Sequence, residues 1–136
     1  MKFKLLLPFL LALTASTFLF TSCTKDKDLT TEIVGTYMGN YEEQPSGFTL
    51  SDVKAVVTKV SDTQADCELT LVAGVDPILF TMEMEDETRF NIPTFTIDTG
   101  DKFHGSGSLE NGTTFKFETE DETDPDSKQI YQGEKQ

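Results

Sequence analysis

Residues 103–118 read FHGSGSLENGTTFKFE, and this stretch decides the fold. Apolar and polar side chains alternate on both sides of Asn111-Gly112, for example at Phe115 and Phe117. Successive side chains of a β-strand point to opposite faces, so each half predicts a strand with one apolar face. An Asn-Gly pair between two such runs is a strong hairpin signal, because both residues tolerate positive φ. The stretch therefore predicts an antiparallel β-hairpin.

The same alternation recurs along the chain after residue 29, where no segment keeps apolar residues at helical spacing over three turns. Turn-forming residues separate the runs at intervals of about 8–14 residues. Pro93 interrupts one run, and since proline cannot donate to a ladder, it predicts an edge, a bulge or a strand corner. The second run shows valines on both faces, which a bulge near Val56-Val57 would reconcile. The expected strands are 33–41, 53–60, 67–71, 78–84, 90–97, 103–109, 115–118 and 130–135.

Eight short strands in one small domain predict an all-β fold. Eight antiparallel strands can close into a barrel whose interior holds side chains or one small ligand. Closure removes exposed edges, and consecutive hairpins make an up-and-down order the simplest topology. We therefore expect an eight-stranded antiparallel up-and-down barrel over residues 33–136.

The first 22 residues have the pattern of a secretory signal, with a basic start followed by the apolar run Leu5–Phe20. The run is shorter than the ~20 residues of a membrane-spanning helix. Thr21-Ser22 before Cys23 resembles the lipobox of bacterial lipoproteins, with Phe20 in place of the usual Leu. The resemblance implies cleavage before Cys23 and attachment of lipid to its sulfur and amine, which would anchor the protein to a membrane. An ordinary signal peptide with an incidental cysteine is the alternative.

Residues 23–32 carry charged side chains without apolar periodicity, which predicts a flexible tether after the lipidated cysteine. Within it, residues 25–28 resemble a Lys-Asp export tag that follows the lipid cysteine in some lipoproteins of the outer membrane. That resemblance implies the cell surface rather than the periplasmic face, although a solvated linker explains the same residues. We expect an outer-membrane lipoprotein on the cell surface or on the periplasmic face, with the cell surface slightly favoured.

Three short motifs resemble calycin-like (lipocalin-like) lipoprotein domains. They are IVGTYMG at 33–39, FHGSGSL at 103–109 before Asn111-Gly112, and IYQGEK at 130–135. The family implies an up-and-down barrel and a pocket for an apolar ligand. It also implies that an aromatic residue of the first strand packs under a basic residue of the last, and Tyr37 and Lys135 are the counterparts here.

Composition leaves little room for chemistry. The chain has 136 residues with 24 acidic and 11 basic side chains, a formal net charge of −13, which argues against nucleic acid as a partner. His104, Ser106 and the acids of the preceding turn are poorly spaced for a catalytic triad, because same-face strand neighbours do not reach hydrogen-bond contact. Cys67 is expected to be a buried thiol, and the acids of 118–126 lack a calcium-loop register. We expect no enzyme activity, no cofactor and no metal site.

Large apolar side chains form the interesting set, because they would face the barrel interior. They either line a cavity for a small apolar molecule or fill the barrel completely. The expected interior or ligand-lining residues are Tyr37, Leu69, Leu71, Phe80, Met82, Met84, Phe90, Phe95, Phe103, Phe115 and Phe117.

Two functional classes remain open. One is a non-enzymatic binding module for a small apolar ligand or a polymer. The other is an accessory or inhibitory subunit that docks on an envelope protein through an acidic surface and the strand-end loops 42–52, 73–77, 86–88, 98–102 and 120–129.

Overall fold

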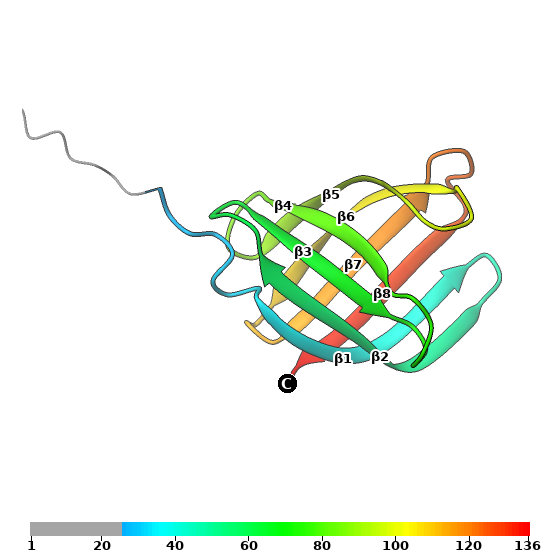
Figure 1. Cartoon of the computed structure of the whole chain (residues 1–136), viewed down its shortest axis with the longest axis horizontal. Coiled ribbons are helices and arrows are strands. Elements are labelled where there is room, and N and C mark those ends of the chain that lie inside the picture. The colour runs from blue at the N-terminus through cyan, green and yellow to red at the C-terminus, as the bar shows by residue number, and fades with distance from the viewer. Residues whose placement is uncertain (1–25) are drawn as a thin grey trace, which may run out of the picture.

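The computed structural model describes residues 26–136, so the predicted signal peptide and Cys23 lie outside the described residues. Eight strands follow one another in chain order around a closed antiparallel barrel, with β8 paired to β1 (Figure 1). The predicted all-β, eight-stranded up-and-down barrel is confirmed. The strands are β1 (Gly35–Gln44), β2 (Phe48–Lys59), β3 (Gln64–Thr70), β4 (Ile78–Met84), β5 (Arg89–Thr96), β6 (Lys102–Glu110), β7 (Thr114–Asp121) and β8 (Lys128–Lys135).

The loops that join the strands lie at the two ends of the barrel. Loops 60–63, 85–88 and 111–113 lie at the end where the chain enters, which we call the proximal end. Loops 45–47, 71–77, 97–101 and 122–127 lie at the opposite, distal end. The predicted contact loops therefore divide, with 86–88 proximal and the others distal, and most of 42–52 is strand rather than loop.

The bulge of β2 lies at Asp52, and the predicted position at Val56-Val57 is wrong. The register between β1 and β2 shifts between Gly39 and Tyr41, where β2 carries one extra residue. Asp52 has a φ of 58°, a left-handed conformation that a short polar side chain tolerates better than a β-branched valine. After this bulge Val53 and Val57 face inward and are buried, with Ala55 between them on the same face.

Aromatic rings fill the middle of the barrel. The Phe115 ring lies 4.8 Å from that of Tyr37 and 5.4 Å from that of Phe90, measured between centroids. The Phe117 ring lies 5.4 Å from that of Tyr131. These contacts, with the buried aliphatic residues around them, form one continuous core, so the centre of the barrel is packed rather than hollow.

Gly107 makes room for one of these rings. A Cβ atom at this position would lie 2.3 Å from Cζ of Phe90 and 2.3 Å from the carbonyl oxygen of Lys116. The glycine of this strand therefore lets a ring of β5 pass over β6.

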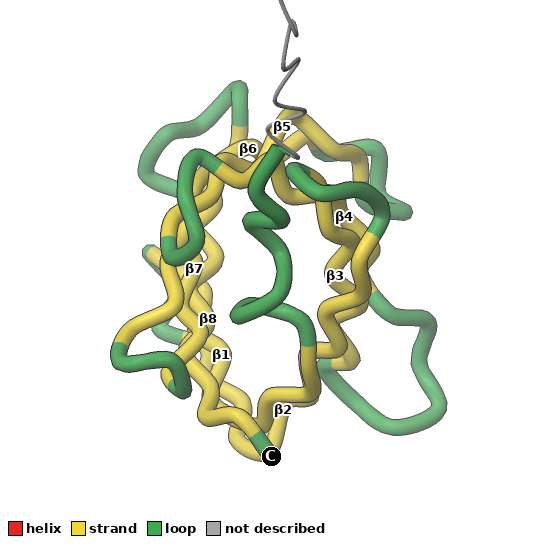
Figure 2. The backbone as a smooth tube through the Cα atoms, turned by 90° about the vertical axis from the view of Figure 1, so that its left-hand side faces the viewer, coloured by secondary structure: helices red, strands yellow, loops and turns green. Residues whose placement is uncertain are grey.

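Residues 28–34 close the proximal end of the barrel. Figure 2 shows this segment crossing the middle of the ring of strands. Thr30 and Ile33 are fully buried, and the Ile33 carbonyl accepts a hydrogen bond of 2.6 Å from the Tyr37 hydroxyl. The Leu29 amide donates to the Asp62 carbonyl at 2.8 Å. The segment is thus packed, and the predicted flexible tether is wrong for residues 28–32, because Leu29 and Ile33 supply apolar surface that the charged composition concealed.

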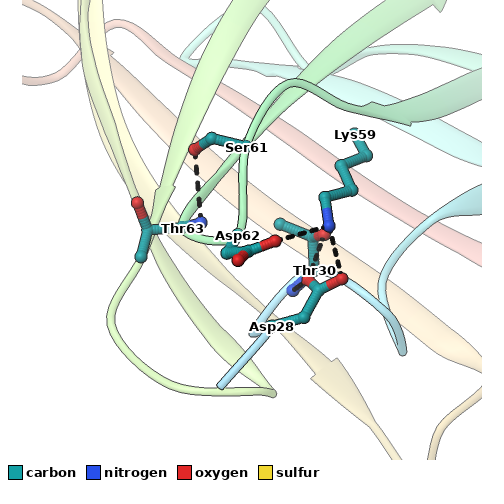
Figure 3. Close-up of polar contacts among 6 residues, drawn as sticks. All are labelled: Asp28, Thr30, Lys59, Ser61, Asp62 and Thr63. Atoms are coloured by element: carbon teal, nitrogen blue, oxygen red, sulfur yellow. Dashed lines mark hydrogen bonds and ion pairs between the residues drawn. The ribbon is translucent and has the colours of Figure 1, made fainter. Parts of the chain in front are cut away.

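An ion pair between Lys59 and Asp28 holds the start of the same segment against the end of β2. Lys59 Nζ lies 2.5 Å from an oxygen of Asp28 and 2.6 Å from one of Asp62, as Figure 3 shows. The other Asp28 oxygen accepts from the backbone and hydroxyl of Thr30. The hydrogen bond from Lys59 is the main reason that the pKa of Asp28 lies well below its usual range.

Candidate functional site

The wall of the barrel is incomplete between β4 and β5. Within residues 26–136 this ladder pairs only Glu83 with Asn91 and Met84 with Phe90, whereas β3 and β4 pair along almost their whole length. Toward the distal end the two strands run apart (Figure 1). We call the space between Ile78–Met82 and Ile92–Thr96 the β4–β5 opening.

Pro93 explains where the ladder stops. The observed register would next place Pro93 opposite Thr81, and proline has no N–H to donate. The pairing of β5 with β6 also shifts between Ile92 and Phe95, so β5 holds an extra residue at this point. The predicted edge, bulge or corner at Pro93 is confirmed as a bulge that turns β5 away from β4.

A pocket of about 360 Å³ occupies the distal end of the opening. Its walls come from loop 71–77 with the start of β4, and from the end of β5 with loop 97–101. The apolar lining residues are Leu71, Val75, Pro77, Ile78, Leu79 and Ile97. This volume lies at the lower end of the range for small-molecule sites.

Two apolar side chains that line this pocket are exposed to solvent, one on the outer face of β4 and one in loop 71–77. Leu79 is 63% exposed and Val75 is 61% exposed. Deeper in, the Phe80 and Phe95 rings, one from each strand, lie 5.2 Å apart between centroids and close the way to the core. Among the described residues that line the pocket, the charged side chains are the carboxylates of Asp76 and Asp98. The site therefore combines an apolar floor with an acidic rim.

A second pocket of about 300 Å³ adjoins the first across loop 97–101, over the distal mouth. Phe103 and Gln129 form its base. Gln129 is almost fully buried and its Oε1 accepts a 3.3 Å hydrogen bond from Thr119. This polar pair inside the barrel was not predicted from the sequence, although the alternation of β7 with Phe115 and Phe117 places Thr119 on the inner face.

A larger hollow, of about 490 Å³, lies beside the β2 bulge and is lined mainly by polar side chains of β1, β2 and β8. It offers less apolar surface than the opening, so the β4–β5 opening is the better candidate for an apolar ligand.

The predicted interior residues divide between the core and the opening. Leu71 and Phe95 are half-buried beside the opening, and Phe80 lies under it. The remaining ones are buried in the core or at its distal edge: Tyr37, Leu69, Met82, Met84, Phe90, Phe103, Phe115 and Phe117. Three residues outside the predicted lining set are also buried: Tyr41, Leu109 and Tyr131.

The basic residue predicted to cover Tyr37 is in place. Tyr37 and Lys135 are direct partners in the β1–β8 ladder, and Lys135 Nζ lies 5.9 Å from the centre of the Tyr37 ring. The same Nζ donates to the Glu32 carbonyl at 2.7 Å, which ties β8 to the segment that closes the proximal end.

The polar residues considered for catalysis lie apart from the opening. His104 Nε2 is 3.2 Å from a carboxylate oxygen of Glu120 on the neighbouring strand, an arrangement that contains neither Ser106 nor an Asp of the preceding turn. Cys67 is buried, and burial raises the pKa of its thiol well above the ordinary value, so the sulfur stays protonated. Asp121 accepts hydrogen bonds from Thr123 within its own turn.

Two features are absent from residues 26–136. No group of three metal-ligating side chains gathers in this part of the chain. Nor does it contain a helix of the length and apolar character needed to cross a membrane.

Comparison with solved structures gives the same architecture. The chain resembles a redesigned β-barrel, mFAP1, bound to DFHBI (TM-score 0.64, 12% identity, 80% of this chain and 100% of that chain). It also resembles another redesigned β-barrel (TM-score 0.62, 16% identity, 81% and 96%) and EF1p2_mFAP2b bound to DFHBI (TM-score 0.60, 15% identity, 80% and 98%). Comparison with protein-family models and with curated proteins gives no match.

Proposed function

We propose that this protein is a non-enzymatic binding module of the bacterial cell envelope, and that it binds a small apolar molecule at the β4–β5 opening. The observation that carries the proposal is the opening itself, where half-buried and exposed apolar side chains surround a pocket of about 360 Å³. Because rings fill the centre of the barrel, the ligand sits in the wall and at the distal mouth rather than along the barrel axis. Two of the similar barrels hold a small molecule, which supports the same class of function.

The binding proposal is tested with Nile red, a neutral dye whose emission rises in apolar sites. We expect enhancement with the wild-type protein and a marked loss in Val75→Lys, which puts a charge into the pocket lining. Val60→Lys is the matched control, since Val60 is a similarly exposed valine (54%) just after β2, at the proximal end. Equal enhancement by both variants, or none by the wild type, would contradict the proposal.

The anchoring part of the proposal concerns Cys23, outside the described residues. A lipid on its sulfur and amine would hold the protein on the outer membrane, with the surface-exposed face of that membrane as the expected location. We expect Cys23→Ser to release the protein from the membrane fraction and Cys67→Ala to leave it bound, since the Cys67 thiol is buried in the barrel. Protease treatment of intact cells then separates the cell surface from the periplasmic face.

Docking on an envelope protein is a second candidate function. The exposed side chains of Val75 and Leu79 line the same pocket as the carboxylates of Asp76 and Asp98, and Val72 of loop 71–77 is also exposed. Capture of a partner from envelope extracts that weakens as salt is raised would support this function. Capture that ignores salt would contradict an electrostatic contribution.

A further inference from the structure

The backbone of β4 has a free edge inside the opening. The Met84 amide donates to the Thr63 carbonyl at 2.8 Å, so the backbone groups of Met84 point toward β3. In an antiparallel ladder this direction alternates from residue to residue. The N–H and C=O groups of Glu83, Thr81 and Leu79 therefore point toward β5. Of these three residues, only Glu83 has a partner there, Asn91.

The free groups belong to Leu79 and Thr81, which have no ladder partner on β5 within residues 26–136. The register sets Thr81 opposite Pro93, which has no N–H, and the bulge of β5 carries the following residues away. The distal half of β5 is held on the other side, where the Thr94 hydroxyl donates to Glu122 at 2.5 Å. Leu79 and Thr81 are exposed residues, and without a ladder partner on β5 their N–H and C=O groups are expected to bond to water in the free protein.

Free N–H and C=O groups along an exposed strand are the standard template for adding a strand from another chain. An extended segment paired with Leu79 and Thr81 would satisfy both residues at once. Its side chains would alternate in direction, and one of them would reach the apolar pocket beside Leu71 and Ile97.

The charges around the edge select the chemistry of that segment. Asp66 and Glu68 lie exposed on β3, Glu83 on β4, and Asp76 and Asp98 at the pocket. The nearest basic side chain on these strands, Arg89, is already paired with Asp86 at 2.7 Å. An added strand would meet carboxylates on its exposed face, which favours lysine or arginine side chains there.

We propose that β4 binds an extended peptide segment, with basic side chains alternating with apolar ones, as an additional strand along Leu79–Thr81. The occupant is a segment of a partner protein, so this inference goes beyond the binding of a small apolar molecule. Both sites share the pocket wall, and an apolar side chain of the peptide takes the place of the small molecule.

The test uses an end-capped peptide of about seven residues in which lysine and valine alternate. We expect its addition to slow hydrogen exchange at the amides of Leu79 and Thr81, because these amides gain backbone partners. Protection that falls only on amides elsewhere, or on none, would overturn the proposal.

Two N-methylated peptides separate backbone pairing from charge attraction. Each carries N-methyl groups at alternate residues, one peptide in each phase, with the charge and side chains unchanged. We expect one of them to bind about tenfold more weakly than the parent peptide, since only one phase of amides faces β4. Equal affinity of both peptides and the parent would show that the carboxylates alone attract the peptide, and the proposal would be wrong.

A substitution in the protein itself, at Thr81, tests the same edge of β4. We expect Thr81→Pro, which removes an N–H without a ladder partner, to weaken the peptide by about tenfold, and Thr81→Val to leave its affinity unchanged. Nile red shows independently whether the pocket is intact. Peptide binding without dye binding would overturn only the small-molecule function, and dye binding without peptide binding only this inference. If Thr81→Pro does not fold, the methylated peptides decide.

Discussion

Phe115 connects more of the core than its neighbours do. Its ring contacts those of Tyr37, Phe90, Phe117 and Tyr131, at centroid distances from 4.8 to 6.1 Å. Such ring pairs add stability beyond the apolar area that they bury. The four partners come from four different strands, so the residue links opposite walls of the barrel.

We expect Phe115→Ala to lower the free energy of unfolding by about 3–5 kcal/mol, because it leaves a cavity among four rings. Phe48→Ala is the control, since Phe48 is 49% exposed and is expected to cost less than about 1 kcal/mol. Urea unfolding of both variants measures the difference. Similar losses from the two substitutions would show that the barrel interior adapts to the missing ring.

Three buried tyrosines make the fold sensitive to alkali. Burial raises the pKa of Tyr37 to about 12 from its ordinary value of 10.0, and burial is also the main cause of the raised pKa of Tyr41 and Tyr131. Their hydroxyls donate to the Ile33 carbonyl, the Glu43 carboxylate and the Val53 carbonyl. The folded state therefore keeps these protons at a pH where the unfolded chain releases them.

The stability that the buried tyrosines contribute is expected to be complete below pH 10 and to be lost progressively as the pH rises from 10.0 through about 12. Each tyrosine contributes a slope of about 1.4 kcal/mol per pH unit in that window. Unfolding midpoints measured across the window test the slope, and Tyr37→Phe should make it shallower. A slope that is unchanged in this variant would show that Tyr37 ionises in the folded protein as readily as in the unfolded chain.

Among the elements, β1 and β8 approach each other closely at Gly39. A Cβ atom there would lie 1.9 Å from the carbonyl oxygen of Gln132 and 2.3 Å from Cα of Gly133, its ladder partner. Backbone atoms cannot give way as the end of a flexible side chain can. The closure of the barrel therefore depends on a glycine at this position.

Gly39→Ala is expected to cost about 2 kcal/mol or more, because the added methyl group must push β1 and β8 apart. Ser106→Ala, an exposed change on β6, is expected to cost less than about 0.5 kcal/mol. Thermal unfolding followed by circular dichroism compares the two. A neutral effect of Gly39→Ala would mean that β8 can shift outward without loss of its pairing.

At the scale of elements, the local sequence pattern predicted the positions of the strands well, but not the position of the β2 bulge or the β4–β5 opening. Period-two alternation located all eight strands, because each has one buried and one solvated face. The alternation did not locate the β2 bulge, because valines occur on both faces of this run. The bulge lies at Asp52, the residue with a positive φ. Pro93 was recognised as a break, but the opening it produces depends on the residue opposite, which only the register supplies.

For the molecule as a whole, the segment before β1 is part of the fold. Residues 28–34 lie across the proximal end and bury Thr30 and Ile33 completely, with Lys135 bonded to the Glu32 carbonyl. The sequence did not reveal this contact, because short charged segments have no periodicity to interpret. The candidate site was likewise hidden, since its lining comes from two loops that are adjacent only in the closed barrel.

We expect a chain that begins at Gly35 to be less stable than one that begins at Lys27, by about 2–4 kcal/mol. The shorter chain loses the burial of Ile33, worth about 1.5–3 kcal/mol, and the hydrogen bond that Tyr37 donates to it. Guanidinium unfolding of both chains measures the difference. Equal stability would show that the segment rests on the barrel without contributing to its stability.

The closed proximal end also determines where a tag can be fused without disturbing the pocket. The backbone amide of Gln136 bonds to Thr36, so β8 finishes beside the incoming chain, at the pole opposite the pocket (Figure 1). A fluorescent protein or an affinity handle fused after Gln136 would leave the carboxylates and the unpaired strand untouched. A sensor built on this scaffold can therefore be immobilised through its proximal end, which leaves the pocket at the distal end accessible to ligand in solution.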